Sequence, residues 1–336
     1  NVVEYILSGI GNNWTDLEKL IYIHDYICDN CDYAHKEDGS VDGGGINQTA
    51  YGCLVNHRSV CDGYARAFYD LCNRVGVKAY YVMSDKMNHA WNAVELNGKH
   101  YYVDCTFDGS YDPTYHTHFL KSYEANGHDA PDVYMTAYIN GLSDKVYLYG
   151  KYHDKDLDDA LWNYSSDSLI LYPGKGFMYK DYSHIYFAET PFSSYEISQV
   201  YVSGDDNQSE PWMSNFIKKG DYIFTCGTRG AFKCTLDLDA RELLMETILH
   251  GYTYEDTTYF YYTGMRIENS IMYLTKNYWD KLPEEEVMVD LTDILKTADG
   301  RVDNSGSASY IEVFNAVWNI VNGSAYWYEN GIKQGT

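Results

Sequence analysis

The sequence predicts an α+β protein in which a helix packs on an antiparallel sheet and a β-rich region follows. Three observations support this class. Apolar residues recur at helical spacing after Cys61. Two segments of alternating character, 89–96 and 99–105, flank Asn97-Gly98, the strongest two-residue signal for a hairpin turn. Beyond about residue 165, short aromatic and β-branched segments alternate with Gly, Asp, Asn and Ser, as is typical of antiparallel sheets.

The length of the chain favours two domains. At 336 residues and 45% hydrophobic content, the chain can bury a large core. The change in character near residue 165 predicts a first domain over residues 1–160 and a β-rich accessory domain over residues 165–336.

The predicted helix places a cysteine in its first turn. Ser59 is the candidate cap, Cys61 begins the helix and Gly76 ends it. The helical spacing is carried by Tyr64, Ala65, Phe68, Leu71, Cys72 and Val75. A thiol at this position feels the positive end of the helix dipole and unpaired N–H groups, which favour the thiolate. Cys61 is therefore a candidate nucleophile.

The predicted hairpin brings a histidine and a carboxylate to one face. The turn pairs Leu96 with Lys99. Counting back along both strands places Trp91 opposite Asp104. His89 lies two residues from Trp91, so it projects from the same face as Asp104 and one diagonal step away.

Thiol, imidazole and carboxylate together have the logic of a base-activated nucleophile. Asp104 can orient His89, and His89 can take the proton of Cys61 if the helix docks on that face. Each residue alone has a simpler interpretation, since a cysteine on an apolar helix is usually a buried hydrophobe and a strand His or Asp is usually a satisfied polar group. The combination is harder to explain by chance.

These residues resemble a known family. Segments 61–65, 89–92 and 101–106 are similar to three blocks of the bacterial transglutaminase-like superfamily, whose fold is related to the papain-like cysteine proteases. Further similarity lies in segments 23–27, 50–55 and 118–122, so that the resemblance spans about residues 14 to 130.

The resemblance implies roles for individual residues. Cys61 would be the nucleophile, His89 the general base and acid, and Asp104 the orienting carboxylate. The oxyanion hole would be the backbone N–H of Cys61 with an upstream donor, for which Tyr33 is the candidate, although such a tyrosine is more often a core residue.

The resemblance also points to the walls of the substrate cleft. Trp91, His100 and Phe107 are the candidate cleft residues. His100 and Phe107 stand where the family often has Trp, so the cleft wall differs here. Asn88, Asn92 and His116 are expected nearby and would make the cleft wetter, which favours hydrolysis over transfer to an amine.

No metal or cofactor is expected in the reaction, because thiolate acyl transfer requires none. Cys28 and Cys31 have the two-residue gap of zinc and redox sites, but no second pair follows, so we interpret them as structural or incidental thiols. The spacing of His116, His118 and His128 matches no metal motif, and the resemblance makes them loop residues around the entrance of the site.

Net charge and hydropathy limit the classes of partner that the protein can have. The formal net charge of −24 argues against nucleic acid and against anionic lipid surfaces. No stretch of eighteen or more apolar residues is present, so no membrane span is expected. The expected partner is a peptide or protein substrate, including one associated with a cell wall.

The β-rich region is expected to form a sandwich or a partial propeller, because its strands are too few for a closed multi-bladed propeller. The predicted strands are 168–172, 184–188, 199–203, 222–226, 232–236, 257–262 and 270–275. The chain contains 37 tyrosines. These residues suit stacking on sugars or proteins, but tyrosine is also an ordinary strand residue.

The last segment indicates a location. A helix is predicted near residues 310–321, and residues 325–336 look like the start of an aromatic-glycine repeat found in surface proteins of Gram-positive bacteria. Together with the absence of an initiator methionine and of a signal peptide at Asn1, this suggests a piece of a longer exported protein, secreted or associated with the cell surface.

The sequence therefore predicts a cysteine-dependent acyl-transfer enzyme acting on peptide amides, either a peptidase or amidase or a transamidating enzyme. The alternative is a non-catalytic cell-wall or adhesion module that keeps the three residues as scaffold. A thiol–disulfide exchanger using Cys28 and Cys31 is disfavoured, because the pair lacks a βαβ setting.

Overall fold

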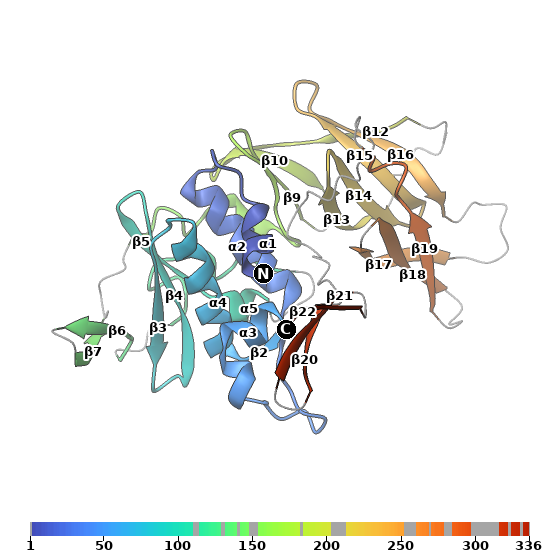
Figure 1. Ribbon diagram of the computed structural model, residues 1–336. Coiled ribbons are helices and arrows are strands. Elements are labelled where there is room, and N and C mark those ends of the chain that lie inside the picture. Colours follow the sequence, from blue (N-terminus) through green and yellow to red (C-terminus); the bar gives the residue numbers. More distant parts are fainter. Residues whose placement is uncertain are drawn as a thin grey trace.

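The chain folds into helices and antiparallel sheets, followed by a region made almost wholly of strands (Figure 1). The computed structural model describes residues 2–109, 114–128, 132–139, 142–147, 154–181, 184–202, 213–251, 260–268, 270–278, 284–296, 316–321, 324–329 and 332–335. The predicted mixture of a helical core with an antiparallel sheet and a β-rich region is confirmed.

The first part of the chain packs helices against a five-stranded sheet. Its helices are α1 (Val2–Ser8), α2 (Asp16–Asn30), α3 (Ala50–Leu54), α4 (Cys61–Arg74) and α5 (Cys105–Asp108), with a 3-10 turn, η1 (Gly45–Gln48). The sheet has the order β5-β4-β3-β6-β7, from β3 (Ala79–Ser84), β4 (His89–Leu96), β5 (Lys99–Val103), β6 (Tyr134–Ile139) and β7 (Leu142–Tyr147). Helix α4 lies between α2 and strands β3 and β4 (Figure 1).

Helix α2 begins with a reciprocal cap. The Thr15 side chain accepts a hydrogen bond from the backbone N–H of Glu18, and the Glu18 carboxylate accepts one from the backbone N–H of Thr15. A cap of this kind contributes about 1 kcal/mol. The helix then buries residues on nearly every side, including Leu20 and Ile23, because α1, α4 and the β-rich region all pack near it.

Helix α4 begins at Cys61, as predicted, but its cap differs. Val60 is the N-cap residue and makes no side-chain cap bond. Ser59 does not cap the helix, because its hydroxyl donates to the backbone oxygen of Asn47 at 2.6 Å instead. A competing acceptor in the preceding loop therefore overrides the local preference. The N-cap residue therefore offers no side-chain acceptor to the first N–H groups of α4.

The hairpin has the predicted register. Leu96 pairs with Lys99, and the pairing continues to Asn92 opposite Val103. The second strand was predicted to reach residue 105, but it ends at Val103, because Asp104 caps α5 and Cys105 begins that helix, so Trp91 has no paired residue at Asp104. Asn97 and Gly98 both have positive φ, 53° and 77°, as a tight hairpin turn requires.

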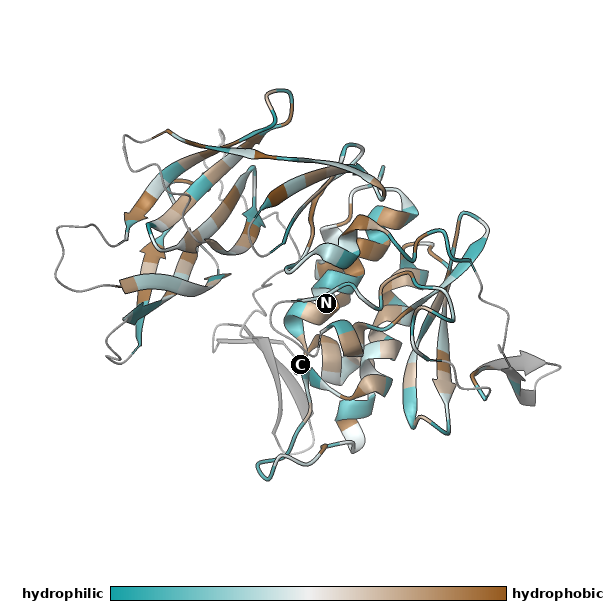
Figure 2. Cartoon of the chain, turned by 180° about the vertical axis from the view of Figure 1, so that it is seen from behind, coloured by the Kyte–Doolittle hydropathy of each residue, from teal (hydrophilic) through white to brown (hydrophobic). Residues whose placement is uncertain are grey.

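The hydrophobic core does not break at the predicted domain division near residues 160–165. Trp162, Phe177 and Ala188 belong to the same buried cluster as Leu20 and other residues of the helices. Figure 2 shows apolar residues along both the helices and the strands of the β-rich region. A single core therefore joins the helical part to the first strands of the β-rich region.

Hydrogen bonds from α2 reinforce this junction. Asp25 accepts from the backbone N–H of Leu169 at 2.8 Å, and Asp29 accepts from the Ser168 hydroxyl at 2.6 Å. Glu18 accepts from the backbone N–H of Gly174 at 2.6 Å.

The β-rich region consists of successive, mostly antiparallel sheets. The first contains β8 (Ile170–Tyr172), β9 (Gly176–Lys180), β10 (Ile185–Thr190) and β11 (Ser193–Glu196). The second contains β13 (Met213–Lys219), β14 (Tyr222–Gly227), β15 (Gly230–Asp237) and β16 (Glu242–His250), with β12 (Ser198–Tyr201) added parallel to β16. The third contains β17 (Phe260–Glu268), β18 (Ile271–Tyr278) and β19 (Glu285–Asp290).

Each predicted strand coincides with an observed one, although residues 168, 169, 184, 202 and 270 lie just outside the observed strands. Strands β9, β11, β13, β16 and β19 were not predicted. Residues 203 and 257–259 of two predicted strands lie outside the described residues.

The predicted helix near residues 310–321 is wrong over residues 316–321. These residues form β20 (Ala316–Val321), which pairs with β21 (Ser324–Glu329), and β22 (Ile332–Gly335) completes the sheet. Residues 310–315 lie outside the described residues. The aromatic and β-branched composition of this segment suits a paired strand. Pairing with β21 therefore favours a strand over the predicted helix.

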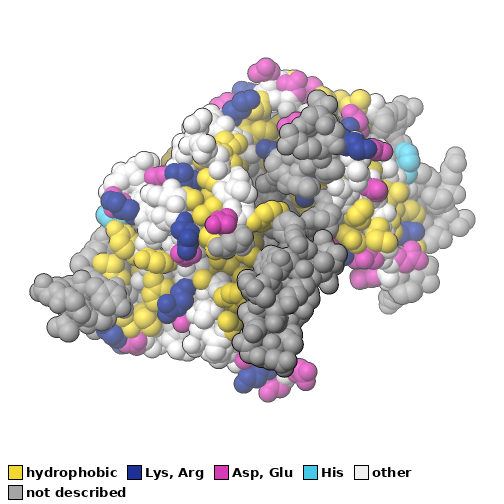
Figure 3. All heavy atoms as spheres, in the orientation of Figure 1, with side chains coloured by type: hydrophobic (Ala, Val, Ile, Leu, Met, Phe, Trp, Pro, Cys, Tyr) yellow, Lys and Arg dark blue, Asp and Glu magenta, His cyan; other side chains and the backbone are white. Residues whose placement is uncertain are grey.

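Charged side chains are spread over the surface. On the face seen in Figure 3, acidic and basic side chains of the described residues are interspersed with apolar ones. Among the described residues, no helix is both long enough and apolar enough to cross a membrane.

Candidate active site

Cys61 differs from the other cysteines in its exposure. All eight cysteines are free thiols, and Cys61 alone is partly exposed while the other seven are buried. It occupies the first position of α4, where the helix dipole favours negative charge. The sequence prediction and the structure thus single out the same thiol as accessible to a substrate.

His89 connects Cys61 to Asp104. The Nε2–H group of His89 donates to Asp104 Oδ2 at 2.6 Å, and the ring also forms a hydrogen bond with the Cys61 side chain. Burial lowers the pKa of His89, but the negative charge and hydrogen bond of Asp104, helped by Cys61, outweigh burial and raise this pKa to about 10. A cationic His89 then stabilises negative charge on the Cys61 sulfur.

Asp104 is fully buried and fully hydrogen-bonded. It is the N-cap of α5, where its Oδ1 accepts from the backbone N–H groups of Thr106 and Phe107 at 2.9 and 3.3 Å. Burial raises the pKa of this carboxyl, but His89 and His128 outweigh burial and hold the pKa well below its usual range. The carboxylate therefore stays charged and fixed in orientation.

His128 contacts the carboxylate of the site, a role that the sequence did not indicate. Its Nε2–H group donates to Asp104 Oδ2 at 2.7 Å, and its Nδ1 bonds to the backbone oxygen of Asn126 at 2.9 Å. Both partners are acceptors, so both bonds form only when the ring carries two protons. His128 is completely buried, which corrects the expectation that it lies at the entrance. No local spacing signal connects it to Asp104.

The other two loop histidines, His116 and His118, do not take part in the hydrogen bonds to Asp104. His116 is completely buried and bonds to Asp25 at 2.7 Å, so it does not line the entrance as expected. His118 remains partly exposed and packs its edge against Phe107, with ring centroids 5.1 Å apart. Asn92 is also buried, donating to the backbone oxygens of Ala65 and Tyr80. His116 and Asn92 therefore do not add polar groups to the cleft, contrary to expectation.

Two aromatic rings stack against His89. Phe107 lies nearly parallel to His89 with centroids 4.8 Å apart, and Trp91 does so at 5.5 Å. Phe107 is 39% exposed, whereas Trp91 is 1% exposed. Phe107 is thus available to a substrate, and Trp91 acts as a support for the ring. His100 pairs with Glu95 toward the turn of the hairpin, away from these residues.

Tyr33 reaches the backbone of the nucleophile. It lies in β1 (Asp32–Tyr33), which pairs in parallel with β2 (Arg58–Ser59), directly before α4. The Tyr33 hydroxyl accepts a hydrogen bond from the backbone N–H of Cys61, and burial raises the pKa of this tyrosine. The structure therefore brings together the two groups that sequence analysis named for the oxyanion hole. If a substrate oxygen took the place of the phenol oxygen, both N–H and O–H could donate to it.

Tyr81 and Asp62 form a second polar contact at the start of α4 that the sequence did not indicate. The Tyr81 hydroxyl donates to Asp62 at 2.5 Å, and Arg66 donates to the same oxygen at 2.9 Å. Burial, followed by the bond to Asp62, raises the pKa of Tyr81. These side chains hold the first turn of α4 against β3.

Ligand atoms of His89, Asp104 and His128 lie within 4.8 Å of one another, as in a metal site. Each imidazole nitrogen near the carboxylate is already used to donate a hydrogen bond to it. The chemistry of this group is therefore that of a carboxylate shared by two imidazoles.

An accessible thiol at a helix N-terminus, joined by hydrogen bonds to a buried imidazole and carboxylate, is the arrangement of a cysteine-based enzyme. Residues 4–108 match the family model of the transglutaminase-like superfamily, so this part of the chain is a transglutaminase-like domain. The predicted resemblance is confirmed over that range.

Two curated relatives are similar to part of the chain, and both are named as peptidases. The chain is 31% identical over 107 residues to kyphoscoliosis peptidase of Homo sapiens and 30% identical to that of Mus musculus. Each match covers 28% of this chain and 16% of the relative, so the chain spans only a small part of these proteins.

Two solved structures are also similar. One is a proposed cysteine protease from Cytophaga hutchinsonii, at 18% identity and a TM-score of 0.26, covering 43% of this chain and 47% of that one. The other is a proposed 6-phosphogluconolactonase from Bacteroides uniformis, at 10% identity and a TM-score of 0.22, covering 77% and 83%.

Proposed function

We propose that this chain is a cysteine-dependent acyl-transfer enzyme that hydrolyses peptide amides. The observation that carries the proposal is the chain of hydrogen bonds from Asp104 through His89 to Cys61, with Asp104 Oδ2 2.6 Å from His89 Nε2. It gives a nucleophile, a proton carrier and an orienting group in contact with one another.

The reaction proceeds in two halves. The Cys61 sulfur attacks the amide carbon, and Tyr33 and the Cys61 N–H donate to the oxygen that becomes negative. His89 gives its proton to the leaving amine, the C–N bond breaks, and a thioester remains. His89, now neutral, takes a proton from water, whose oxygen attacks the thioester and releases the carboxylic acid and the Cys61 sulfur. Asp104 keeps the ring oriented throughout.

Hydrolysis is favoured over transfer to an amine. Five polar or substituted positions were expected to make the cleft wet, and two of these, Asn92 and His116, are buried with other partners. Hydrolysis is supported by exposed Phe107, which stands where the family often has Trp, and by the relatives, which are named as peptidases. Cross-linking of proteins remains the competing reaction of the same thioester.

Labelling of thiols tests the proposal. At pH 6, iodoacetamide should modify Cys61 faster than an ordinary exposed cysteine, and peptide mapping identifies the site. His89→Asn should slow this labelling, whereas His184→Asn, an exposed histidine beside Asp181 in the β-rich region, should leave it unchanged. Labelling of Cys61 at an ordinary rate would support the alternative, a non-catalytic module on the same scaffold.

A second assay separates the two reactions. A glutamine-bearing peptide is incubated with the protein and a labelled primary amine. We expect release of ammonia or of a cleaved peptide without efficient incorporation of the amine. Incorporation that exceeds hydrolysis and depends on Cys61 would make the protein a cross-linking enzyme.

We further propose that the protein works outside the cell, at a bacterial surface, with a peptide or protein of the cell wall as its substrate. The aromatic-glycine segment over residues 325–336 supports this location. In the same proposal, the successive sheets of residues 165–336 form a sandwich or partial propeller that holds the substrate or the wall. Binding of purified cell walls by wild-type protein and by Cys61→Ala tests this: equal retention of both is expected, and no retention would contradict it.

A further inference from the structure

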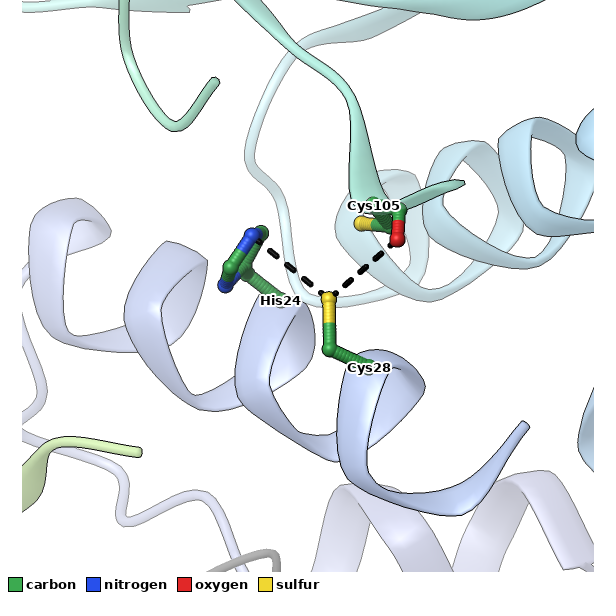
Figure 4. A group of neighbouring side chains, drawn as sticks. All are labelled: His24, Cys28 and Cys105. Atoms are coloured by element: carbon green, nitrogen blue, oxygen red, sulfur yellow. Dashed lines mark hydrogen bonds between the residues drawn. The ribbon is translucent and has the colours of Figure 1, made fainter. Parts of the chain in front are cut away.

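A second cluster of reactive side chains lies buried between α2 and α5, outside the candidate active site. It consists of His24 and Cys28 on α2 and Cys105 at the start of α5, which are 0%, 7% and 3% exposed. Figure 4 shows the His24 ring and the sulfur of Cys28 turned toward Cys105 across the gap between the two helices. The mechanism proposed above uses none of these residues.

The spacing of these atoms is that of ligands around one ion. His24 Nε2 lies 3.6 Å from Cys28 Sγ, and the ligand atoms of all three residues lie within 4.8 Å of one another. In a tetrahedral zinc site, with Zn–N of about 2.0 Å and Zn–S of about 2.3 Å, the nitrogen and a sulfur are about 3.5 Å apart and two sulfurs about 3.8 Å. The cluster fits these separations without rearrangement of His24 and Cys28.

His24 is held as a metal-binding histidine is held. Its Nδ1–H group donates to Asp25 Oδ1 at 2.8 Å, which directs Nε2 toward the sulfurs. A carboxylate on the far nitrogen is the usual support of an imidazole that ligates zinc. Asp108 Oδ2 lies 3.1 Å from the same Nε2 as its hydrogen-bond partner, outside the group of three, so this carboxylate would move toward the ion to complete the coordination. Two thiols, one imidazole and one carboxylate form a donor set suited to zinc.

The pair that the sequence singled out is not this site. Cys31 directs its sulfur to the backbone oxygen of Asp32 and to Cys53, away from Cys28. The candidate ligands are instead His24 and Cys28, one helical turn apart on α2, together with Cys105 and Asp108 on the distant helix α5. The group of His24, Asp25 and His116 is different again, because there a carboxylate is shared between two imidazoles by hydrogen bonds.

We propose that His24, Cys28 and Cys105, with Asp108 in the fourth position, bind a structural zinc ion. When zinc binds, the two thiols release their protons to solvent, and so does His24 Nε2 where it is protonated. No electron is transferred. The ion would join α2 to the first residue of α5. Because Asp104 directly precedes Cys105 and caps α5, the same ion would fix the helix that carries the carboxylate of the candidate active site.

The metal content of the full chain, purified under reducing conditions and without chelator, tests the proposal. We expect about one zinc per chain by mass spectrometry of metals. Replacement of the zinc by cobalt should give the intense visible bands of a tetrahedral site together with a thiolate-to-cobalt charge-transfer band. Cys28→Ser and Cys105→Ser should each lower zinc affinity at least about tenfold.

Two variants serve as controls. Cys72→Ser replaces a completely buried thiol of the same core that lies outside the ligand group, and it should keep the zinc. Cys61→Ser removes the proposed nucleophile and should also keep it, which separates this site from the proposed reaction. Loss of zinc in Cys72→Ser or Cys61→Ser would overturn the assignment of ligands.

The wild-type protein decides the matter even if a serine variant fails to fold. A chain that folds without zinc, gives no charge-transfer band with cobalt and titrates all eight cysteines as thiols would overturn the proposal. A disulfide between Cys28 and Cys105, seen as two fewer free thiols in the denatured protein, would overturn it as well.

Discussion

Replacing Asp104 by Asn removes the charge that keeps His89 cationic. His89 is 9% exposed at its side chain, and burial alone lowers its pKa; Asp104 is the main reason that this pKa stands at about 10. The rise from the ordinary value of about 6.5 corresponds to roughly 5 kcal/mol in favour of the imidazolium, at about 1.4 kcal/mol per pH unit. In Asp104→Asn, burial dominates, so we expect the pKa of His89 to fall below about 6.5.

The consequence is measured at Cys61. In the wild-type protein, His89 remains cationic from acid pH until the pH approaches about 10, so labelling of Cys61 by iodoacetamide should be fast across the neutral range. In Asp104→Asn, less than roughly one-tenth of His89 is cationic at pH 7.5, and labelling there should slow about tenfold or more. The pH dependence of the labelling rate, followed by peptide mapping, and the NMR titration of the His89 ring report these two quantities separately.

Asp70→Asn is the matched control. Asp70 lies on α4, the helix of Cys61, but forms an exposed ion pair with Arg74. This variant should leave both the labelling rate and the titration of His89 unchanged. A His89 ring that still titrates near pH 10 in Asp104→Asn, or unchanged labelling of Cys61 at pH 7.5, would refute the role given to Asp104.

Four further predictions follow from the same contacts. Because the pKa of His89 is raised in the folded state, its contribution to stability is fully present below about pH 6.5 and is lost as the pH rises through about 10, so urea unfolding should show a decline over this window that Asp104→Asn reduces. His128→Leu leaves Asp104 Oδ2 with one imidazole donor instead of two and should destabilise the protein by about 2 kcal/mol in the same assay, while the surface change His184→Leu should not. Tyr33→Phe should slow acylation by a peptide amide by about tenfold to a hundredfold without changing alkylation by iodoacetamide, since alkylation forms no oxyanion; equal loss of both rates would contradict this role. A chain that ends at residue 160 lacks Trp162, Phe177 and Ala188 of the shared core and should lose cooperative thermal unfolding, whereas one that ends at residue 197 should keep it and keep fast labelling of Cys61.

Local signals in the sequence were sufficient for the parts of the site that depend on local geometry. Asn97-Gly98 sets the register of the hairpin, and this register brings the end of β5, directly before Asp104, alongside the strand that begins with His89. The start of α4 at Cys61 follows from apolar spacing in the same way. The hairpin register and the start of α4 depend only on residues that are near one another in the chain, so they can be predicted from the sequence.

The remaining features depend on contacts between distant segments. His128 reaches Asp104 across 24 residues, and no spacing rule encodes that contact. Ser59 prefers an acceptor in another loop to the helix that follows it. The core that joins Leu20 to Phe177 crosses the predicted domain division. The amino-acid composition changes near residue 165, but the hydrophobic packing continues across it. In each case a tertiary partner, rather than a local preference, decides the outcome.

Neighbouring residues at the start of α5 connect the two buried clusters. Asp104 turns its carboxylate to His89 and His128, and the next residue, Cys105, turns toward α2. The contact between α5 and α2 is close: a Cβ atom added at Gly109 would lie 3.0 Å from the Cα atom of Cys28 and 2.9 Å from the backbone oxygen of Cys105. Because α5 is only four residues long, a displacement at Gly109 must reach Asp104. The orientation of His89 therefore depends partly on how tightly α5 packs on α2.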